Sequence, residues 1–384
     1  MRKITIILSL LVSTALYSQN YQVGHQQITY IDSSRSNRSI MTEIYYPSTT
    51  AGDNVAIANG QFPLLVFGHG YSMAWSAYQW LWDSIVPYGY IMIFPRTEGS
   101  MSPSHQDFGL DLRFLNEQLK KENVLSSSFF YQHLSNTSAI MGHSMGGGAS
   151  FLAAENYTNF TTLINFAAAT TSPSSITAAT HVTSPLLMFS GENDGVAPTA
   201  SHQIPMYDSC ISACKTHITI TGGGHCYFAD YNFTCNLGEM ATSPQPVITR
   251  EAQHAEIAYL LIPYLNFMLK SSSVDESLFL NRLTNDSNIT YVRNCNTAVL
   301  PSDMTFIHVY PNPAIDMINI SIPNNNKETL ISLFDVYGRI LYEGNTISDF
   351  FQLSLDRYSK NGIYFLQIIQ DRNTRTFKIV TKIF

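Results

Sequence analysis

The sequence predicts an α/β fold, a mostly parallel sheet with helices on both faces, followed by a small all-β domain. Short apolar runs alternate with helical patterns between residues 63 and 270. A glycine-rich turn at residues 142–146 joins one of these runs to a helix of small residues. After residue 303 the pattern changes to short β runs separated by turn residues. Together these observations predict two domains in a chain of 384 residues.

The first domain is expected to begin with two strands, near residues 27–31 and 40–46, joined by a polar turn. Short apolar runs predict further strands near residues 63–67, 90–94, 138–141, 162–166, 185–190 and 217–221. Helical patterns fall near residues 73–86, 108–121, 145–156 and 251–270. Because strands and helices alternate, helical crossovers can join the strands in parallel order.

The second domain is expected to be a small β-sandwich. Its predicted strands lie near residues 306–310, 317–322, 330–336, 362–369 and 376–380. Asparagine, proline and glycine residues separate these runs and favour tight turns.

The turn at residues 142–146 reads Gly-His-Ser-Met-Gly. A G-x-S-x-G turn between a strand and a helix presents a serine nucleophile, because the tight turn exposes the hydroxyl at the top of the sheet. The alternative is a glycine-rich turn without chemistry. The strand before it and the small-residue helix after it favour Ser144 as a nucleophile.

A serine nucleophile needs a base, and the base needs an acid that orients it. Asp194 and His225 each follow a predicted strand, where open α/β sheets place their functional groups. In this assignment Asp194 holds the imidazole in the required tautomer, and His225 takes the proton of Ser144. Glu192 is the rival acid, but it lies nearer to the end of the strand.

The donors of an oxyanion hole are expected at two backbone positions. The strand at residues 63–67 runs into Gly-His-Gly-Tyr, so one donor is the N–H of Tyr71. The other is the N–H of Met145, the residue after the nucleophile.

Two further side chains are assigned to the substrate pocket. His143 precedes the nucleophile, and Trp75 follows the oxyanion turn. The alternative for Trp75 is a place in the core, because it shares a helical face with Tyr78 and Trp82.

With these residues the chain resembles secreted α/β-hydrolase esterases of the cutinase-like, polyester-hydrolase type. The resemblance spans roughly residues 25–270 and rests on residues 142–148, 193–198 and 222–226. It implies hydrolysis of carboxylic esters without a cofactor, and we separately expect no metal ion at the site. It also implies the catalytic triad and the oxyanion donors named above.

The sequence differs from that family at positions near the active site, so it does not identify the natural ester substrate. The best-known plastic-degrading members carry Trp where this chain has His143, and about two dozen residues separate His225 from the last helix. A polyester hydrolase, a general carboxylesterase or lipase-like enzyme, and a platelet-activating-factor-acetylhydrolase-like esterase therefore stay open. A serine peptidase and a non-enzymatic surface-binding protein are further alternatives.

The tail at residues 305–384 resembles a type IX secretion C-terminal sorting domain. The resemblance rests on residues 309–313, 334–339, 361–365 and 378–382. It implies export by the type IX machinery, and thus a secreted or cell-surface protein. The alternative is a carbohydrate-binding or general β module.

The chain opens with a positive start and an apolar run, which is typical of a secretory signal peptide at residues 1–19. The run is too short for a stable transmembrane anchor. The remaining boundaries are a catalytic domain at residues 20–295, a linker at 296–304 and the sorting domain at 305–384.

Charge and cysteine content limit the partners and the compartment. The formal net charge is −7, and no basic stripe is visible, which argues against nucleic acid as a partner.

Five cysteines favour an oxidising compartment. Sequence proximity favours the bridges Cys210–Cys214 and Cys226–Cys235, and a metal site at His225 and Cys226 is the alternative.

Overall fold

The structure is a computed structural model, and it describes residues 21–295, 307–322, 328–358, 362–370 and 373–381. The chain divides into two compact units, and the boundary in the sequence falls between Cys295 and Asn296. The predicted signal peptide at residues 1–19 and the predicted linker at 296–304 lie outside the described residues, so both stay predictions. Among the described residues, no helix is both long and apolar enough to cross a membrane.

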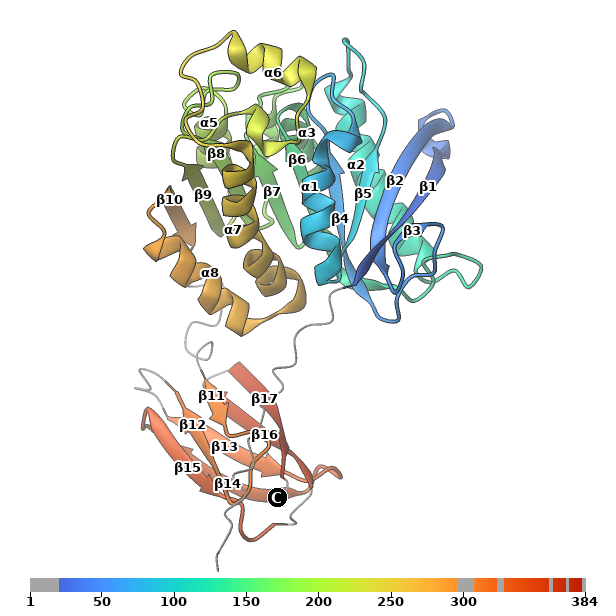
Figure 1. Cartoon of the computed structure of the whole chain (residues 1–384). Helices are drawn as coiled ribbons and strands as arrows, with labels where there is room; N and C mark the ends of the chain where they lie inside the picture. The colour runs from blue at the N-terminus through green and yellow to red at the C-terminus, as the bar shows by residue number, and fades with distance from the viewer. Residues whose placement is uncertain (1–20, 296–306, 323–327, 359–361, 371–372, 382–384) are drawn as a thin grey trace, which may run out of the picture. The chain divides into compact units, whose positions relative to one another are not determined.

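The first unit is built on one ten-stranded sheet, in the order β10-β9-β8-β7-β6-β4-β5-β2-β1-β3 (Figure 1). Its strands are β1 (Gln22–Asp32), β2 (Arg38–Ser48), β3 (Gly52–Asp53), β4 (Phe62–Gly68), β5 (Ile91–Pro95), β6 (Leu134–His143), β7 (Thr162–Phe166), β8 (Leu186–Gly191), β9 (Cys214–Ile220) and β10 (Ile289–Cys295). The central strands from β5 to β9 pair in parallel. Antiparallel pairs occur towards the two edges, between β1 and β2, β2 and β5, and β9 and β10.

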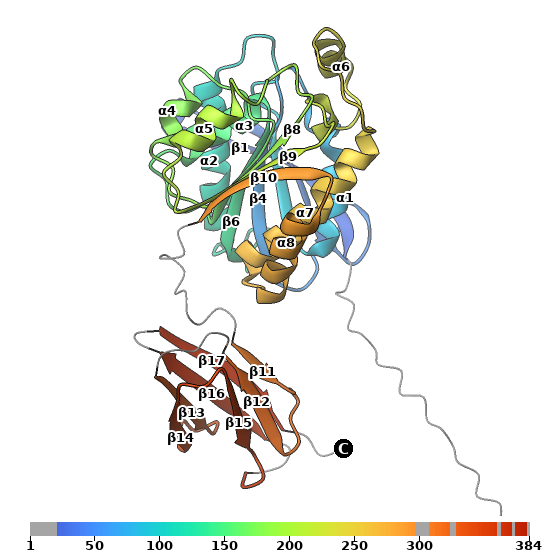
Figure 2. The ribbon, with the colours of Figure 1, turned by 90° about the vertical axis from the view of Figure 1, so that its left-hand side faces the viewer.

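Helices cover both faces of this sheet (Figure 2). They are α1 (Gln79–Ile85), α2 (His105–Glu122), α3 (Met145–Ala154), α4 (Ser175–Ala179), α5 (Gln203–Ser209), α6 (Phe233–Met240), α7 (Arg250–Lys270) and α8 (Ser273–Asn285). The face with α2, α3, α4 and α5 holds one hydrophobic core, and the face with α1, α7 and α8 holds another. The predicted α/β class is confirmed.

The alternation of side chains along β4 explains why its sequence is a continuous apolar run. Leu64 and Val66 lie in the core beneath α2 and α3, while Leu65 and Phe67 lie in the core beneath α1 and α7. Successive side chains of a strand point to opposite faces, so a strand covered on both faces needs apolar residues throughout.

The predicted helix at residues 73–86 is shorter in the structure. A 3-10 turn occupies Trp75–Tyr78, and α1 begins only at Gln79. The residues before the turn belong to the loop that follows β4, where the N–H of Met73 donates to the carbonyl of Gly70.

One predicted disulfide is wrong and the other is confirmed. Cys214 bonds to Cys295, and Cys210 is a buried free thiol. The reason is the edge strand β10, whose register places Cys295 directly opposite Cys214 on β9. The bridge between Cys226 and Cys235 is present.

The second unit contains two antiparallel sheets. One has the order β11-β12-β15 and the other β14-β13-β16-β17. Their bounds are β11 (His308–Tyr310), β12 (Met317–Ser321), β13 (Thr329–Phe334), β14 (Ile340–Thr346), β15 (Phe350–Ser354), β16 (Ile363–Gln370) and β17 (Asn373–Val380). Inward-facing side chains of both sheets, among them Ile320 and Leu366, share one core. The predicted all-β character of the tail is confirmed.

Candidate active site

The turn between β6 and α3 holds Ser144 in a strained backbone conformation. Its φ is 54° and its ψ is −119°, a combination that residues with a Cβ rarely adopt. A Cβ on Gly142 would lie 2.3 Å from the carbonyl carbon of Gly146, and one on Gly146 would lie 2.1 Å from the carbonyl oxygen of Gly68. Only glycine therefore lets the strand, the turn and the helix approach this closely.

The three predicted triad residues lie together in one hydrogen-bonded chain. The Oγ of Ser144 is 3.0 Å from Nε2 of His225, and Nδ1 of His225 is 2.8 Å from Oδ2 of Asp194. Because the carboxylate accepts at Nδ1, the proton of a neutral imidazole sits there and Nε2 is free to accept from the serine. The residues are 9 %, 5 % and 2 % exposed for Ser144, Asp194 and His225 respectively.

The acid is fixed by its own loop. Oδ1 of Asp194 accepts from the N–H of Val196 at 3.0 Å and from that of Ala197 at 2.7 Å. Both carboxylate oxygens are therefore hydrogen-bonded, which fixes the orientation of the carboxylate towards the imidazole. The rival Glu192 is exposed and accepts instead from the N–H of Gly222 at 2.8 Å.

The topology explains why residues far apart in the sequence meet here. Ser144 follows β6, Asp194 follows β8 and His225 follows β9, and these strands belong to the parallel part of the sheet. The carboxyl ends of parallel strands open onto the same edge, so the three loops converge there.

The two predicted oxyanion donors are backbone groups that the fold leaves without a partner. Met145 is the first residue of α3, so its N–H has no acceptor inside the helix. Across the described residues, neither this N–H nor that of Tyr71 makes a hydrogen bond. The peptide that carries the Tyr71 N–H is held through the carbonyl of Gly70, which accepts from Met73 at 3.1 Å and lies 2.9 Å from Nδ1 of His69.

Comparison with known proteins gives two family matches. Residues 20–243 match the family described as PET hydrolase-like, and residues 308–382 match the secretion system C-terminal sorting domain. The chain belongs to the PET hydrolase-like family. The predicted resemblance is thereby confirmed for both parts of the chain. The sorting domain marks the protein as secreted or carried to the cell surface.

Among curated proteins the chain is similar to cutinases of the genus Thermobifida. Cutinase 1 of Thermobifida cellulosilytica is 27 % identical over 185 residues, which cover 47 % of this chain and 64 % of that protein. Cutinase est1 of Thermobifida alba is 25 % identical over 189 residues, or 47 % and 56 % of the two chains. The cutinase of Thermobifida fusca is 27 % identical over 185 residues, with the same coverage as est1. The matches span between half and two thirds of these relatives.

The PET hydrolase-like part of the chain contains a buried histidine where a pocket residue was expected. His143 has no exposed surface, so the expectation that it lines the substrate pocket is corrected. Burial, together with the nearby His225, holds the pKa of its ring well below the ordinary value. Its Nδ1 lies 2.9 Å from Oη of Tyr78, and its Nε2 lies 3.1 Å from the carbonyl oxygen of His225.

Trp75 packs against a residue of β2 and the residue that follows β5. Its indole N–H donates to Oη of Tyr45 at 3.2 Å, and the guanidinium of Arg96 lies 4.1 Å from the ring centroid. The ring is half-buried, and its place in the acyl pocket stays a prediction.

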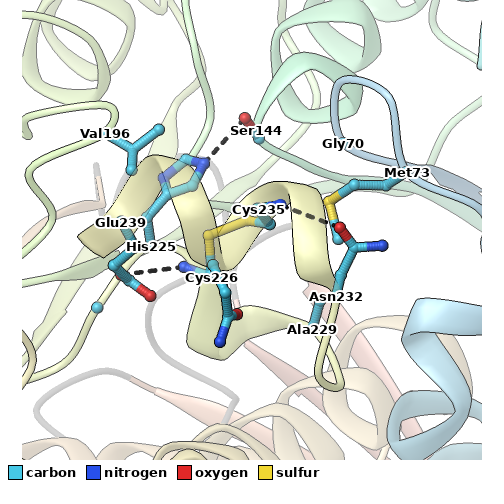
Figure 3. Close-up of a disulfide and its surroundings, with 12 residues drawn as sticks. Gly70, Met73, Ser144, Val196, His225, Cys226, Ala229, Asn232, Cys235 and Glu239 are labelled. Atoms are coloured by element: carbon cyan, nitrogen blue, oxygen red, sulfur yellow. Dashed lines mark hydrogen bonds between the residues drawn. A yellow bond between two sulfur atoms is a disulfide. The ribbon is translucent and has the colours of Figure 1, made fainter. Parts of the chain in front are cut away.

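A short helix that the sequence did not reveal is attached to the histidine loop of this PET hydrolase-like protein (Figure 3). The disulfide Cys226–Cys235 ties α6 to the residue next to His225. Oε1 of Glu239 accepts from the N–H of Cys226 at 3.2 Å, and burial raises the pKa of this carboxyl. The side chain of Asn232 caps the helix by accepting from the N–H of Cys235 at 3.0 Å.

The first turns of α7 hold the same loop from the core side. The side-chain amide of Gln253 accepts from the N–H of Gly224 at 2.9 Å and donates to its carbonyl at 3.0 Å. The guanidinium of Arg250 donates to the carbonyls of Cys226 and Ala229. The backbone on either side of His225 is thus fixed by α6 and by α7.

The alternative metal site is contradicted by the disulfide, because the sulfur of Cys226 is bonded to Cys235. Elsewhere in the described part of the chain, no three side chains of the metal-binding types gather in a position to hold an ion.

Proposed function

We propose that this protein is a secreted serine hydrolase that cleaves carboxylic esters through an acyl-enzyme. The single observation that carries the proposal is the continuous chain of hydrogen bonds from Ser144 through His225 to Asp194. Membership of the PET hydrolase-like family and similarity to cutinases support it.

The proposed reaction has two halves. In the first, Nε2 of His225 takes the proton of Ser144 as Oγ attacks the ester carbonyl carbon, and the N–H groups of Tyr71 and Met145 receive the oxyanion. Collapse of this intermediate breaks the C–O bond, and His225 gives its proton to the departing alcohol. In the second half, His225 takes a proton from water as the water oxygen attacks the acyl carbon. The bond from that carbon to Oγ of Ser144 then breaks, His225 returns the proton to Oγ, and the acid leaves.

Asp194 carries no proton in this scheme. Its carboxylate stabilises the imidazolium that forms twice in each cycle and keeps the ring turned with Nε2 towards the serine. The chain's own residues supply each step, so no cofactor is proposed.

We further propose a polyester, of cutin or synthetic type, as the substrate class. Three apolar side chains of α6 point to solvent, with Phe233 66 %, Leu237 51 % and Met240 74 % exposed. The same helix turns its one carboxylate, Glu239, inward. An uncharged apolar surface attached to the histidine loop suits a substrate that is itself uncharged and apolar.

Substrate class is tested by comparing three kinds of substrate with one protein preparation. Esters of p-nitrophenol with acetate, butyrate and octanoate test ester chemistry, an amorphous polyester film tests polymer access, and peptide anilides test peptidase activity. The proposal expects turnover of the esters and soluble products from the film. Cleavage of the soluble esters with an untouched film would favour a general carboxylesterase, and cleavage of anilides alone would indicate a peptidase.

For the second unit we propose export by the type IX machinery, with that machinery as its partner. The match to the sorting domain supports this role. The unit has a hydrophobic core of its own, and all three triad residues precede residue 296. Residues 20–295 would then form the catalytic domain.

Removing the tail is expected to separate export from catalysis. A chain of residues 20–303, which keeps the bridge Cys214–Cys295, should hydrolyse soluble p-nitrophenyl butyrate as fast as the full-length chain. In the native host the chain that ends at residue 303 should stay in the periplasm, which cell fractionation and immunoblotting would show. Unchanged export, or a folded truncated chain without ester turnover, would contradict the assignment.

A further inference from the structure

A buried chain of hydrogen bonds links the oxyanion loop to the catalytic histidine. The N–H of Gly70 donates to Oη of Tyr78 at 2.8 Å. That oxygen lies 2.9 Å from Nδ1 of His143, whose Nε2 lies 3.1 Å from the carbonyl oxygen of His225. Tyr78 and His143 are both fully buried.

The direction of each hydrogen bond follows from its partners. Nε2 of His143 faces a carbonyl oxygen, which can only accept, so this nitrogen carries the proton of the neutral ring. Nδ1 is then an acceptor, and the hydroxyl of Tyr78 donates to it. The lone pair of the same hydroxyl accepts from Gly70. Burial keeps the pKa of His143 far below its usual value, so the ring stays neutral and the direction does not reverse.

Both ends of the chain are parts of the proposed machinery. Gly70 precedes Tyr71, whose N–H is an oxyanion donor, and His225 is the general base. The oxyanion loop also packs tightly against these hydrogen-bonded side chains. A Cβ on Gly70 would lie 3.2 Å from Nδ1 of His143 and 2.6 Å from Sδ of Met73.

We propose that Tyr78 and His143 are positioning residues that hold the oxyanion loop and the backbone of His225 in one fixed relation. Through them, the Tyr71 N–H and the His225 imidazole face the same ester carbonyl. The inference rests on the proposed ester hydrolysis and deepens it. It also gives the buried His143 a role that a pocket residue could not have.

Two other buried tyrosines of the protein serve as matched controls for the removal of a tyrosine hydroxyl. Oη of Tyr90 donates to Oδ1 of Asn266 at 2.7 Å, and Oη of Tyr264 lies 2.7 Å from Oγ1 of Thr162. The first hydroxyl joins the residue before β5 to α7, and the second joins α7 to β7. Within the described residues, neither hydroxyl hydrogen-bonds to the oxyanion loop or the histidine loop. A Tyr→Phe change at either position therefore removes the same atom without reaching the proposed site.

The decisive variant is Tyr78→Phe, measured beside Tyr90→Phe and Tyr264→Phe with p-nitrophenyl butyrate. Loss of the hydroxyl leaves the Gly70 N–H without its acceptor and Nδ1 of His143 without its donor. We expect kcat to fall about tenfold to a hundredfold with KM little changed, because small misplacements of catalytic groups have effects of this size. The two controls should keep the kcat of the wild type. A kcat of Tyr78→Phe equal to theirs would overturn the proposal.

A double-variant cycle tests whether the two residues act through one chain. His143→Phe keeps an aromatic ring and removes both nitrogens. If the chain acts as a unit, Tyr78→Phe combined with His143→Phe should lose no more kcat than the worse single variant. Losses that multiply would show two independent effects and would contradict a shared chain.

A readout without turnover separates this inference from the proposed function. If the wild type hydrolyses no ester, the proposed function fails, but NMR of ¹⁵N-labelled histidine still tests the chain. The wild type should show His143 protonated at Nε2 only, and Tyr78→Phe should shift the ring resonances of His225 while Tyr264→Phe does not. A His143 proton on Nδ1, or unmoved His225 resonances, would rule the chain out.

Discussion

Replacing Ser144 with alanine is expected to abolish ester hydrolysis while the fold stays intact. The variant has no Oγ to form the acyl-enzyme, and removal of a triad serine lowers kcat by about 10⁶-fold in well-studied hydrolases. The strained backbone at this position is imposed by the packing of β6 against α3, so alanine inherits the same turn. The measurement is kcat on p-nitrophenyl butyrate, with circular dichroism to confirm folding.

Ser150→Ala is the matched control for this variant. Ser150 is a fully buried serine on α3, and its hydroxyl donates to the carbonyl of Gly147 at 2.6 Å. Its loss should leave kcat nearly unchanged. If Ser144→Ala kept activity within about tenfold of the wild type, the serine would not be the nucleophile.

Replacing Asp194 with asparagine is expected to lower kcat by about 10⁴-fold, the size of effect that this change has in a serine protease triad. The neutral amide cannot stabilise the imidazolium. An amide N–H at the position of Oδ2 would also favour the tautomer with the proton on Nε2, which cannot accept from Ser144. The acceptor for the N–H groups of Val196 and Ala197 is kept, so the loop should stay folded.

Glu192→Gln is the control because it changes the rival acid in the same way. The side-chain carbonyl of glutamine can still accept from the N–H of Gly222. In the described part of the chain, the side chain of Glu192 makes no hydrogen bond to His225. We expect kcat close to that of the wild type. Reversed losses in the two variants would identify Glu192 as the triad acid.

The central strands and the order of the triad could be predicted because their signals are local. A strand covered on both faces favours a continuous apolar run, and β4 and β8 have the longest of these runs, while β6 and β7 have shorter ones. Ser144, Asp194 and His225 each stand within a few residues of the end of a predicted strand, namely β6, β8 and β9. Their positions in the sequence therefore predict that they lie at one edge of the sheet.

The edge of the sheet could not be predicted in the same way. β10 exposes most of its side chains and has no apolar alternation. Because the sequence does not indicate this strand, proximity in the sequence favours Cys210 as the partner of Cys214, although the bond is to Cys295. The helix α8 before it has only two fully buried side chains, Phe279 and Leu283, so its helical period is weak.

The supports of the histidine loop were missed for a different reason. Nothing in the sequence around Glu239 distinguishes it from a solvent-exposed glutamate on a short helix. Only the tertiary structure shows that its carboxylate points inward and accepts from the N–H of Cys226. The cysteine spacing was the one available signal, and it correctly linked Cys226 to Cys235. The inward position of His143 has no local signal, because it depends on Tyr78 and on the carbonyl of His225.

The most direct test of the proposed mechanism is covalent capture of the nucleophile. Diethyl p-nitrophenyl phosphate reacts with an activated serine: Oγ bonds to phosphorus, and p-nitrophenolate leaves. Mass spectrometry of digested protein should find one diethylphosphoryl group per chain, on Ser144, and none on the Ser144→Ala variant. Labelling should also be slower in His225→Gln, because the serine then loses its base. An enzyme that hydrolyses esters yet carries the label on another residue, or carries none, would contradict the account.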